Sequence, residues 1–403
     1  MSSKTALCTY LCLPVVLVLV VLTAVTNFIG RRHDSTDDNG SAAASQHVAS
    51  ETALEKRVID AIQEDDTADL TSLLNTGLDA NLTFVHSQEG NRSLLINAAE
   101  AGHADIVQLL LTHGADPNVG DATGFTPLIY AVCSRAPDIV DLLLHNGASV
   151  NQLTVKGGSA LASASAFGDI EIMQRLVESG ASVNPQLEHE GAFPPLTAAA
   201  MNYQREAMQW LLDNGASVDA ISEESRPLFK MMNSNATASD DTMACVTLMV
   251  DAGNDPSTRH TDRDGGTLTH YAARYLPDLQ VLDYLISEGA VIDEADIDGK
   301  TPLSYAIVHR KPEMAIAVAQ RLIDAGADIN GQHDGVTPLF CAVWFCHEIE
   351  DITVVQFLID NGADLSLRNG AGQSIIDVAE EATMGDLRNE LVQVLREAME
   401  HGG

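Results

Sequence analysis

The hydrophobic positions of this chain repeat along most of its length. A Leu-rich segment that closes on a glycine returns many times, for example as LLLTHGADPN at 109–118 and LLLHNGASVN at 142–151. Its apolar residues fall at i, i+3 and i+4, which predicts an amphipathic helix that ends at the glycine. The closing glycines lie 33 to 38 residues apart and are Gly77, Gly114, Gly147, Gly180, Gly215, Gly253, Gly289, Gly326 and Gly362.

A second phrase recurs between these segments, as TPLIYA at 126–131, TPLSYA at 301–306 and TPLFCA at 337–342. Threonine suits a helix N-cap because its hydroxyl accepts a backbone N–H bond, and proline fits the first helical position, where no donor is needed. The Leu and Ala that follow predict a short helix that a neighbour can approach closely. Each period is therefore expected to be a helix–turn–helix unit, with a polar hairpin leading to the next Thr-Pro.

One such unit cannot bury its own apolar face, but stacked units can. The sequence therefore predicts an all-α solenoid over residues 51–400, built from about nine helix–turn–helix units joined by β-hairpin-like loops. The segment 53–77 lacks the Thr-Pro start and is expected to cap the N-terminal end. The polar-flanked helix at 384–403 is expected to cap the other end.

These phrases together resemble the ankyrin repeat, and the unit AAEAGHADIVQLLLTHGADPN at 98–118 matches the family pattern nearly throughout. The resemblance covers about residues 51–400. It implies stacked repeats that bind a protein partner on a concave face, made of the hairpin tips and the first helix of each unit. It implies a scaffold without a substrate pocket.

The chain departs from the family pattern in two ways. The family often places His fourth in its Thr-Pro-Leu-His phrase, where the ring bonds to the loops. Only His270 clearly keeps this residue, whereas Ile129, Ser304 and Phe340 replace it elsewhere. The unit at 225–253 is the weakest match, and we expect it to be the softest point of the array.

The N-terminus carries an uncharged apolar run over residues 6–29, long enough to cross a bilayer as a helix. Residues 1–30 are therefore predicted to be a transmembrane anchor or a signal segment, preceding the repeats as one hydrophobic helix. Ala24-Val25-Thr26 could be a cleavage site, but Arg31 and Arg32 follow it closely, and bases there impede export.

We favour an uncleaved single-pass membrane anchor, with a secreted protein lacking residues 1–26 as the alternative. The basic residues on the two sides of the run are nearly balanced, so the side of the membrane that holds the repeats stays open. Residues 31–50 are polar, small and without periodicity, which predicts a flexible linker between the anchor and the repeats.

The composition is strongly acidic. The formal net charge is −35, from 57 acidic and 22 basic residues. Such a chain repels phosphates, so we expect no nucleic-acid partner. The charge can attract a protein with a basic surface, or it can serve only solubility. We expect the protein to be a monomer.

Residues with catalytic or metal-binding potential form no known constellation. The chain lacks a nucleophile elbow, a P-loop, a dinucleotide-binding glycine motif and a zinc-protease motif. Its six cysteines are scattered and are interpreted as small buried hydrophobes. We therefore expect no enzyme activity, no cofactor and no metal site. A metal-dependent or enzymatic regulator that uses the acidic loops is the least favoured alternative.

Partner-binding candidates come from aligning the units. Met201, Arg274 and Trp344 fall at one equivalent position of the first helices, and Phe345 follows Trp344. An exposed Trp is a common interface anchor. The expected hairpin tips carry acidic residues, and those chosen as partner-binding candidates are Asp121, Asp262, Asp264, Asp296 and Asp298.

One acidic stretch, DEADIDGKTPLSYA at 293–306, looks like a calcium loop. With Gly299 at loop position 6, Asp296 and Asp298 fit positions 3 and 5. Position 12 is then Tyr305, which cannot supply the bidentate carboxylate that calcium needs. We therefore interpret the stretch as a hairpin in which Gly299 turns the chain and Thr301 caps the next helix. Its acidic residues are expected to belong to a solvent-facing acidic ridge that repeats along the array.

Overall fold

The structure is a computed structural model that falls into two compact units, Met1–Ser217 and Val218–Gly403, here called the N-terminal and C-terminal units. Each unit is described by itself. The described residues are 53–86, 90–185, 193–218, 227–232, 241–258, 265–275, 279–308, 311–331, 335–382 and 385–401. The predictions for residues 1–30 and 31–50 lie outside these ranges. Within the described ranges, no helix is long and apolar enough to cross a membrane.

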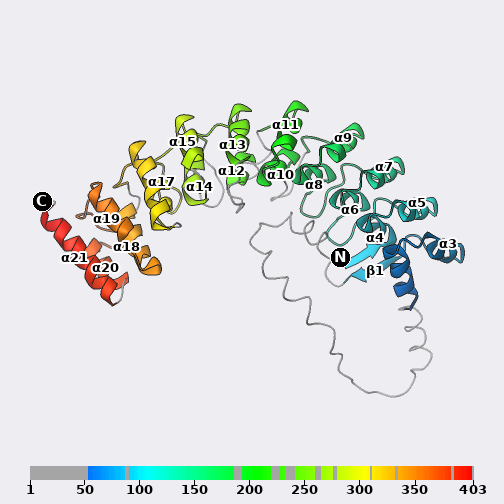
Figure 1. The fold of residues 1–403 in the computed structure, drawn as a ribbon, viewed down its shortest axis with the longest axis horizontal. Helices are drawn as coiled ribbons and strands as arrows, with labels where there is room; N and C mark the ends of the chain where they lie inside the picture. Colours follow the sequence, from blue (N-terminus) through cyan, green and yellow to red (C-terminus); the bar gives the residue numbers. More distant parts are fainter. Residues whose placement is uncertain are drawn as a thin grey trace, which may run out of the picture. The chain divides into compact units, whose positions relative to one another are not determined.

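Antiparallel helix pairs make up both units (Figure 1). The N-terminal unit contains a helix over 53–63, α3 (Thr67–Asn75), α4 (Leu94–Ala101), α5 (Ala104–Thr112), α6 (Pro127–Cys133), α7 (Pro137–His145), α8 (Ala160–Phe167), α9 (Ile170–Glu178), α10 (Pro195–Met201) and α11 (Arg205–Asp213). The C-terminal unit contains α12 (Pro227–Met232), α13 (Asp241–Asp251), α14 (Leu268–Tyr275), α15 (Leu279–Ser287), α16 (Pro302–Val308), α17 (Pro312–Asp324), α18 (Pro338–Ile349), α19 (Thr353–Asp360), α20 (Ile375–Ala382) and α21 (Asp386–His401).

Within each unit the first helices of successive pairs pack on one another, and so do most of the second helices. In the N-terminal unit α4, α6, α8 and α10 form one row, while α5, α7, α9 and α11 form the other (Figure 1). In the C-terminal unit the first-helix row is α12, α14, α16, α18 and α20. The predicted solenoid of stacked helix–turn–helix units is therefore confirmed for the described residues.

The threonine N-caps and the helix-ending glycines that the sequence predicts are present at the following helices. The Thr126 hydroxyl accepts the N–H of Ile129 at 3.3 Å, with Pro127 opening α6, and Thr337 does the same for α18. At the end of α5, Gly114 has a φ of 87°, a left-handed conformation that glycine adopts at little cost. Beyond it, Ala115 N–H donates to the Leu110 carbonyl at 3.0 Å, which satisfies an acceptor of the last turn.

Among the described residues, the hairpins at 121–125 and 296–300, which precede first helices, are tight turns. In the N-terminal unit another hairpin extends into two antiparallel strands, β1 (Thr83–His86) and β2 (Gly90–Ser93), with Thr83 opposite Ser93. In the C-terminal unit, the ring of His270 links two repeats. Its Nδ1 accepts the Thr267 N–H and its Nε2 donates to the Lys300 carbonyl, both at 2.9 Å. The role that the family resemblance implied for this His is thus confirmed.

Asparagine side chains also connect consecutive repeats, at the loops that follow the second helices. The Asn118 amide donates to the Gly147 carbonyl at 3.1 Å, and its oxygen accepts the Ser149 N–H at 2.7 Å. Each such side chain crosses to the loop that follows the second helix of the next repeat. The equivalent residues in the two units are Asn81, Asn151, Asn184 and Asn330.

These amide bridges are expected to stabilise stacking. Asn118→Ala removes two hydrogen bonds between repeats, which predicts a loss of about 1–2 kcal/mol in the free energy of unfolding. Asn146→Ala is the matched control, because the Asn146 amide bonds only to the Leu142 carbonyl within its own repeat. Urea denaturation followed by circular dichroism measures both. Equal losses in the free energy of unfolding would show that the bridge between repeats stabilises the fold no more than a hydrogen bond within one repeat.

Candidate functional site

The hairpin carboxylates were expected to face solvent, and at two positions they do not. Asp121 is 7% exposed, because its Oδ1 accepts the N–H groups of Thr123 and Phe125 at 2.8 and 3.0 Å. Its Oδ2 accepts the hydroxyl of Tyr130, on α6, at 2.8 Å. The carboxylate therefore holds the turn together and ties it to the helix that follows.

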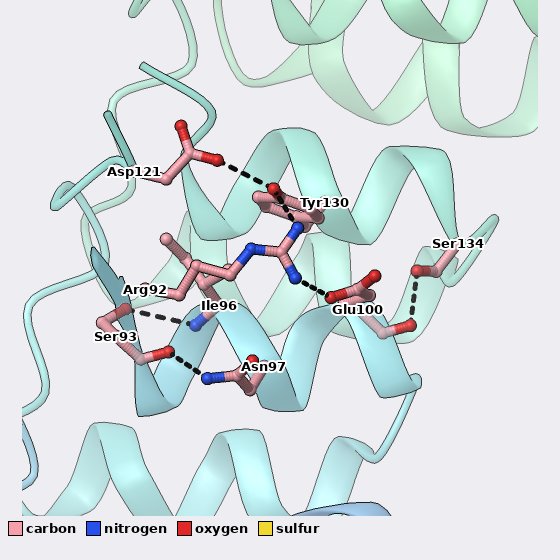
Figure 2. A network of polar contacts seen from close by, with 8 residues as sticks. All are labelled: Arg92, Ser93, Ile96, Asn97, Glu100, Asp121, Tyr130 and Ser134. Carbon is pink, nitrogen blue, oxygen red and sulfur yellow. Dashed lines mark hydrogen bonds and ion pairs between the residues drawn. The ribbon is translucent and has the colours of Figure 1, made fainter. Parts of the chain in front are cut away.

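A buried cation completes this arrangement (Figure 2). Arg92, at the end of β2, is 2% exposed. Its guanidinium donates to the Tyr130 hydroxyl and to the Glu100 carboxylate, and it stacks over the Tyr130 ring at 4.6 Å from the centroid. A buried cation is stable only when it is paired and hydrogen-bonded. The network joins β2, α4 and α6, so it fixes one repeat against the next.

The C-terminal unit repeats the same turn. Asp296 is 6% exposed, and its Oδ1 accepts the N–H groups of Asp298 and Lys300, both at 2.9 Å. Its Oδ2 accepts the hydroxyl of Tyr305 at 2.7 Å. Gly299 has a φ of 78°. The interpretation of this stretch as a hairpin is therefore confirmed, and Tyr305, the residue that fails as a calcium ligand, is the partner of the carboxylate.

The prediction of a solvent-facing acidic ridge is therefore wrong for Asp121 and Asp296. Both are buried because backbone N–H groups and a tyrosine occupy their oxygens. Asp298 does face solvent, since its side chain is 67% exposed, with its Oδ2 3.6 Å from the Lys300 Nζ. Asp262 and Asp264 lie outside the described residues. A repeated spacing of nine residues from Asp to Tyr is the sequence signal that could have revealed the pairing.

The candidates on the first helices lie in different units. Met201 ends α10 in the N-terminal unit and is half-buried. In the C-terminal unit Arg274 lies on α14, with its guanidinium 5.4 Å from the centroid of the Tyr305 ring. Trp344 and Phe345 lie on α18, where Trp344 is 59% exposed and Phe345 is half-buried. The structure thus gives Trp344 the exposure that an interface anchor needs.

Three cysteines of the C-terminal unit, Cys245, Cys341 and Cys346, are buried free thiols, as the sequence predicts. The prediction is wrong for Cys133, which is half-buried and forms a disulfide bond. Burial raises the pKa of the Cys346 thiol to about 11, and burial also raises the pKa of Cys341. Because the thiolate is the reactive form, these side chains are inert packing groups at neutral pH. Among the described residues, no three His, Cys, Asp or Glu side chains are grouped so that they could hold a metal ion.

A regular array of stacked helix pairs defines a repeat scaffold. A family model for ankyrin repeats matches residues 58–154, 234–330 and 270–369, which is more than half of the chain. The protein belongs to the ankyrin-repeat family. Ankyrin repeats typically bind protein partners and are generally non-catalytic, which suggests a protein-interaction scaffold.

Similar proteins share the repeats only. The mouse 2-5A-dependent ribonuclease is 39% identical over 90 residues, which are 22% of this chain and 12% of that protein. Its human counterpart is 35% identical over 101 residues, which are 25% of this chain and 13% of the relative. An ankyrin repeat protein of fowlpox virus is 34% identical over 84 residues, covering 21% and 11% of the two chains. The match spans about an eighth of each ribonuclease and covers only the repeats.

The two tyrosine–aspartate pairs should differ in their contribution to stability. Tyr130→Phe deprives both buried Arg92 and Asp121 of a partner, so we expect a loss of about 2–3 kcal/mol in the free energy of unfolding. Tyr305→Phe removes one bond at a half-buried side chain and should lose about 1 kcal/mol. Chemical denaturation of the two variants measures the difference. A larger loss for Tyr305→Phe would contradict the role given to Arg92.

Proposed function

We propose that this chain is a non-catalytic scaffold that binds a protein partner through the first helices and hairpins of its repeats. The observation that carries the proposal is Trp344, an aromatic side chain that is 59% exposed on the first-helix row of the C-terminal unit. A large apolar side chain left in water on a rigid array is suited to fill a pocket in a partner. The surrounding helices need no rearrangement to present it.

A partner with a basic surface suits this scaffold. The net charge of −35 raises the rate at which a cationic protein meets it, and exposed acids such as Asp298 can contact that partner at the rim. Charge at a rim contributes more to the rate of association than to the final affinity. Binding is therefore expected to weaken as salt is added, because salt screens exposed charges.

Membrane attachment is a second part of the proposal. The apolar run over 6–29 is long enough to span a bilayer, and residues 31–50 supply a polar linker to the repeats. An anchored scaffold concentrates its partner at a membrane surface. The alternative remains a secreted protein that has lost residues 1–26. An enzymatic or metal-dependent regulator has no support from the geometry of the described residues.

Removing the aromatic anchor should weaken capture of the partner. Full-length protein is solubilised in mild detergent, immobilised and incubated with proteins of its own cells. Trp344→Ala should reduce retention of the captured partner about tenfold or more, as for a central interface residue. Gln356→Ala is the control, because Gln356 lies on α19, the second helix of the same repeat. If Trp344→Ala retained as much partner as the control, the proposed surface would be wrong.

The anchor can be tested apart from binding. Mass spectrometry of the N-terminus of protein isolated from its own cells is expected to find residues 1–30 intact. Alkaline carbonate extraction should leave the protein with the membrane pellet, because a spanning helix is not released by charge or pH. A mature chain that begins near Asn27 and stays in the soluble fraction would replace the anchor with the secreted alternative.

A further inference from the structure

Four side chains of the C-terminal unit occupy one register on consecutive first helices. Each lies seven residues after the residue that opens or caps its helix: Arg274 on α14, Val308 on α16, Trp344 on α18 and Glu381 on α20. These opening residues are Thr267, Thr301, Thr337 and Ser374. The four helices pack in this order, so the side chains form one line across the repeats, here called the register row.

The chemistry of the register row changes in a definite order. Arg274 and Val308 are half-buried, whereas Trp344 and Glu381 are exposed. The row therefore runs from a cation through an aliphatic and an aromatic side chain to an acid. Two corresponding positions of the N-terminal unit are less available, since Glu100 is paired with buried Arg92 and Ala166 is 8% exposed.

Glu381 is exposed and is held in place by a neighbouring side chain. One of its carboxylate oxygens accepts the Gln373 side-chain amide at 2.9 Å. Its neighbour Glu380 lies 3.4 Å from the Arg396 guanidinium, so that acid is already balanced. No ion pair to Glu381 is found among the residues that the structure describes. A basic group of a partner can therefore supply the missing counter-charge.

The spacing of the row suits an occupant in the polyproline II conformation. Packed helices lie about 8–10 Å apart, so successive side chains of the row are separated by about that distance. A polyproline II segment has three residues per turn and rises about 3.1 Å per residue, which returns a side chain to the same face every 9 Å or so. A β-strand cannot match this spacing on one face, because residues i and i+3 of a strand point in opposite directions.

We propose that the register row binds an extended partner segment in the polyproline II conformation, with anchors at every third residue. The segment places one apolar side chain on Val308, a second on Trp344 and a lysine or arginine at Glu381. Its pattern is apolar-x-x-apolar-x-x-basic, or the same pattern in the opposite chain direction. Aromatic side chains commonly receive such segments, because their ordering cost on binding is low. This inference rests on the proposed scaffold function and names the chemistry of its partner.

The intrinsic fluorescence of Trp344 reports occupancy directly. The chain has two Trp residues, and the other, Trp210, lies on α11 of the N-terminal unit, so Trp210→Phe leaves Trp344 as the single reporter. The probe is a proline-rich ten-residue peptide that carries Leu, Leu and Lys at intervals of three, made in both chain directions. Full-length protein in detergent is titrated with each, and the tighter direction is used thereafter. We expect a saturable blue shift as the indole leaves water.

Two comparisons make the test specific. A peptide of the same composition with its anchors at intervals of two should bind about tenfold more weakly, since two of its three anchors leave the row. Replacing the peptide Lys by Glu should weaken binding to a similar extent, and Glu381→Lys should reverse that preference. Far-ultraviolet circular dichroism checks that the Glu381→Lys variant is folded. The inference fails if the interval does not matter, if the charge preference survives Glu381→Lys, or if no peptide shifts the emission.

Failure here is distinguishable from failure of the scaffold itself. If the peptides do not bind but Trp344→Ala still releases the captured partner, the surface is used by a folded partner and the polyproline II assignment is wrong. If Trp344→Ala leaves partner capture unchanged while the peptides bind as expected, the row is a peptide site and the proposed scaffold partner docks elsewhere.

Discussion

Every feature of this molecule depends on the contact between consecutive repeats. A single helix pair exposes the apolar residues that its sequence places on one face, and only the next pair can cover them. The row of first helices from α4 to α10, and the row from α12 to α20, are the result. Because the same contact recurs, equivalent positions of successive first helices lie next to one another. Side chains at these positions become neighbours although they are more than 30 residues apart in sequence.

Polar groups make this stacking specific. The amide of Asn118 reaches the next repeat at one end of the pair, and the Asp121–Tyr130–Arg92 network joins repeats at the other. The bonds of Asn118 lie at the exposed surface, whereas the network satisfies the buried side chains of Arg92 and Asp121. An acidic hairpin residue can therefore be a structural part of the turn. This explains why a high count of acids at hairpins does not translate into an equally charged ridge.

Much of the fold could be predicted from the sequence because its determinants are local. The Thr-Pro caps, the Leu spacing of the second helices and the closing glycines act within one unit, and one chain contains many examples of each. The fate of Asp121 and Asp296 could not be predicted in this way. Whether a carboxylate faces water depends on which backbone N–H groups point at it, and this is set by the geometry of the turn.

In the candidate site, too, some residues can be predicted from local sequence and others only from the packing of the repeats. Aligning the units predicts Trp344 as a candidate, and its exposure agrees with the role predicted for it. Glu381 is not among the predicted candidates, because Ser374 replaces the Thr-Pro signal at the start of α20. Counting seven residues from Ser374 would have found it. Glu381 matters for the proposed binding because it lies beside Trp344 of α18, and the packing of α18 against α20 brings the two side chains together.

The central claim is that the first-helix row of the C-terminal unit is the surface that meets a partner. Site-specific photo-crosslinking in the cells that make the protein tests it most directly. A photoreactive amino acid is placed at Val308, beside Trp344 on the first-helix row, or at Gln356 on the second helix α19. The account predicts a crosslinked partner protein from position 308 and none from position 356. A crosslink from position 356 alone would contradict it.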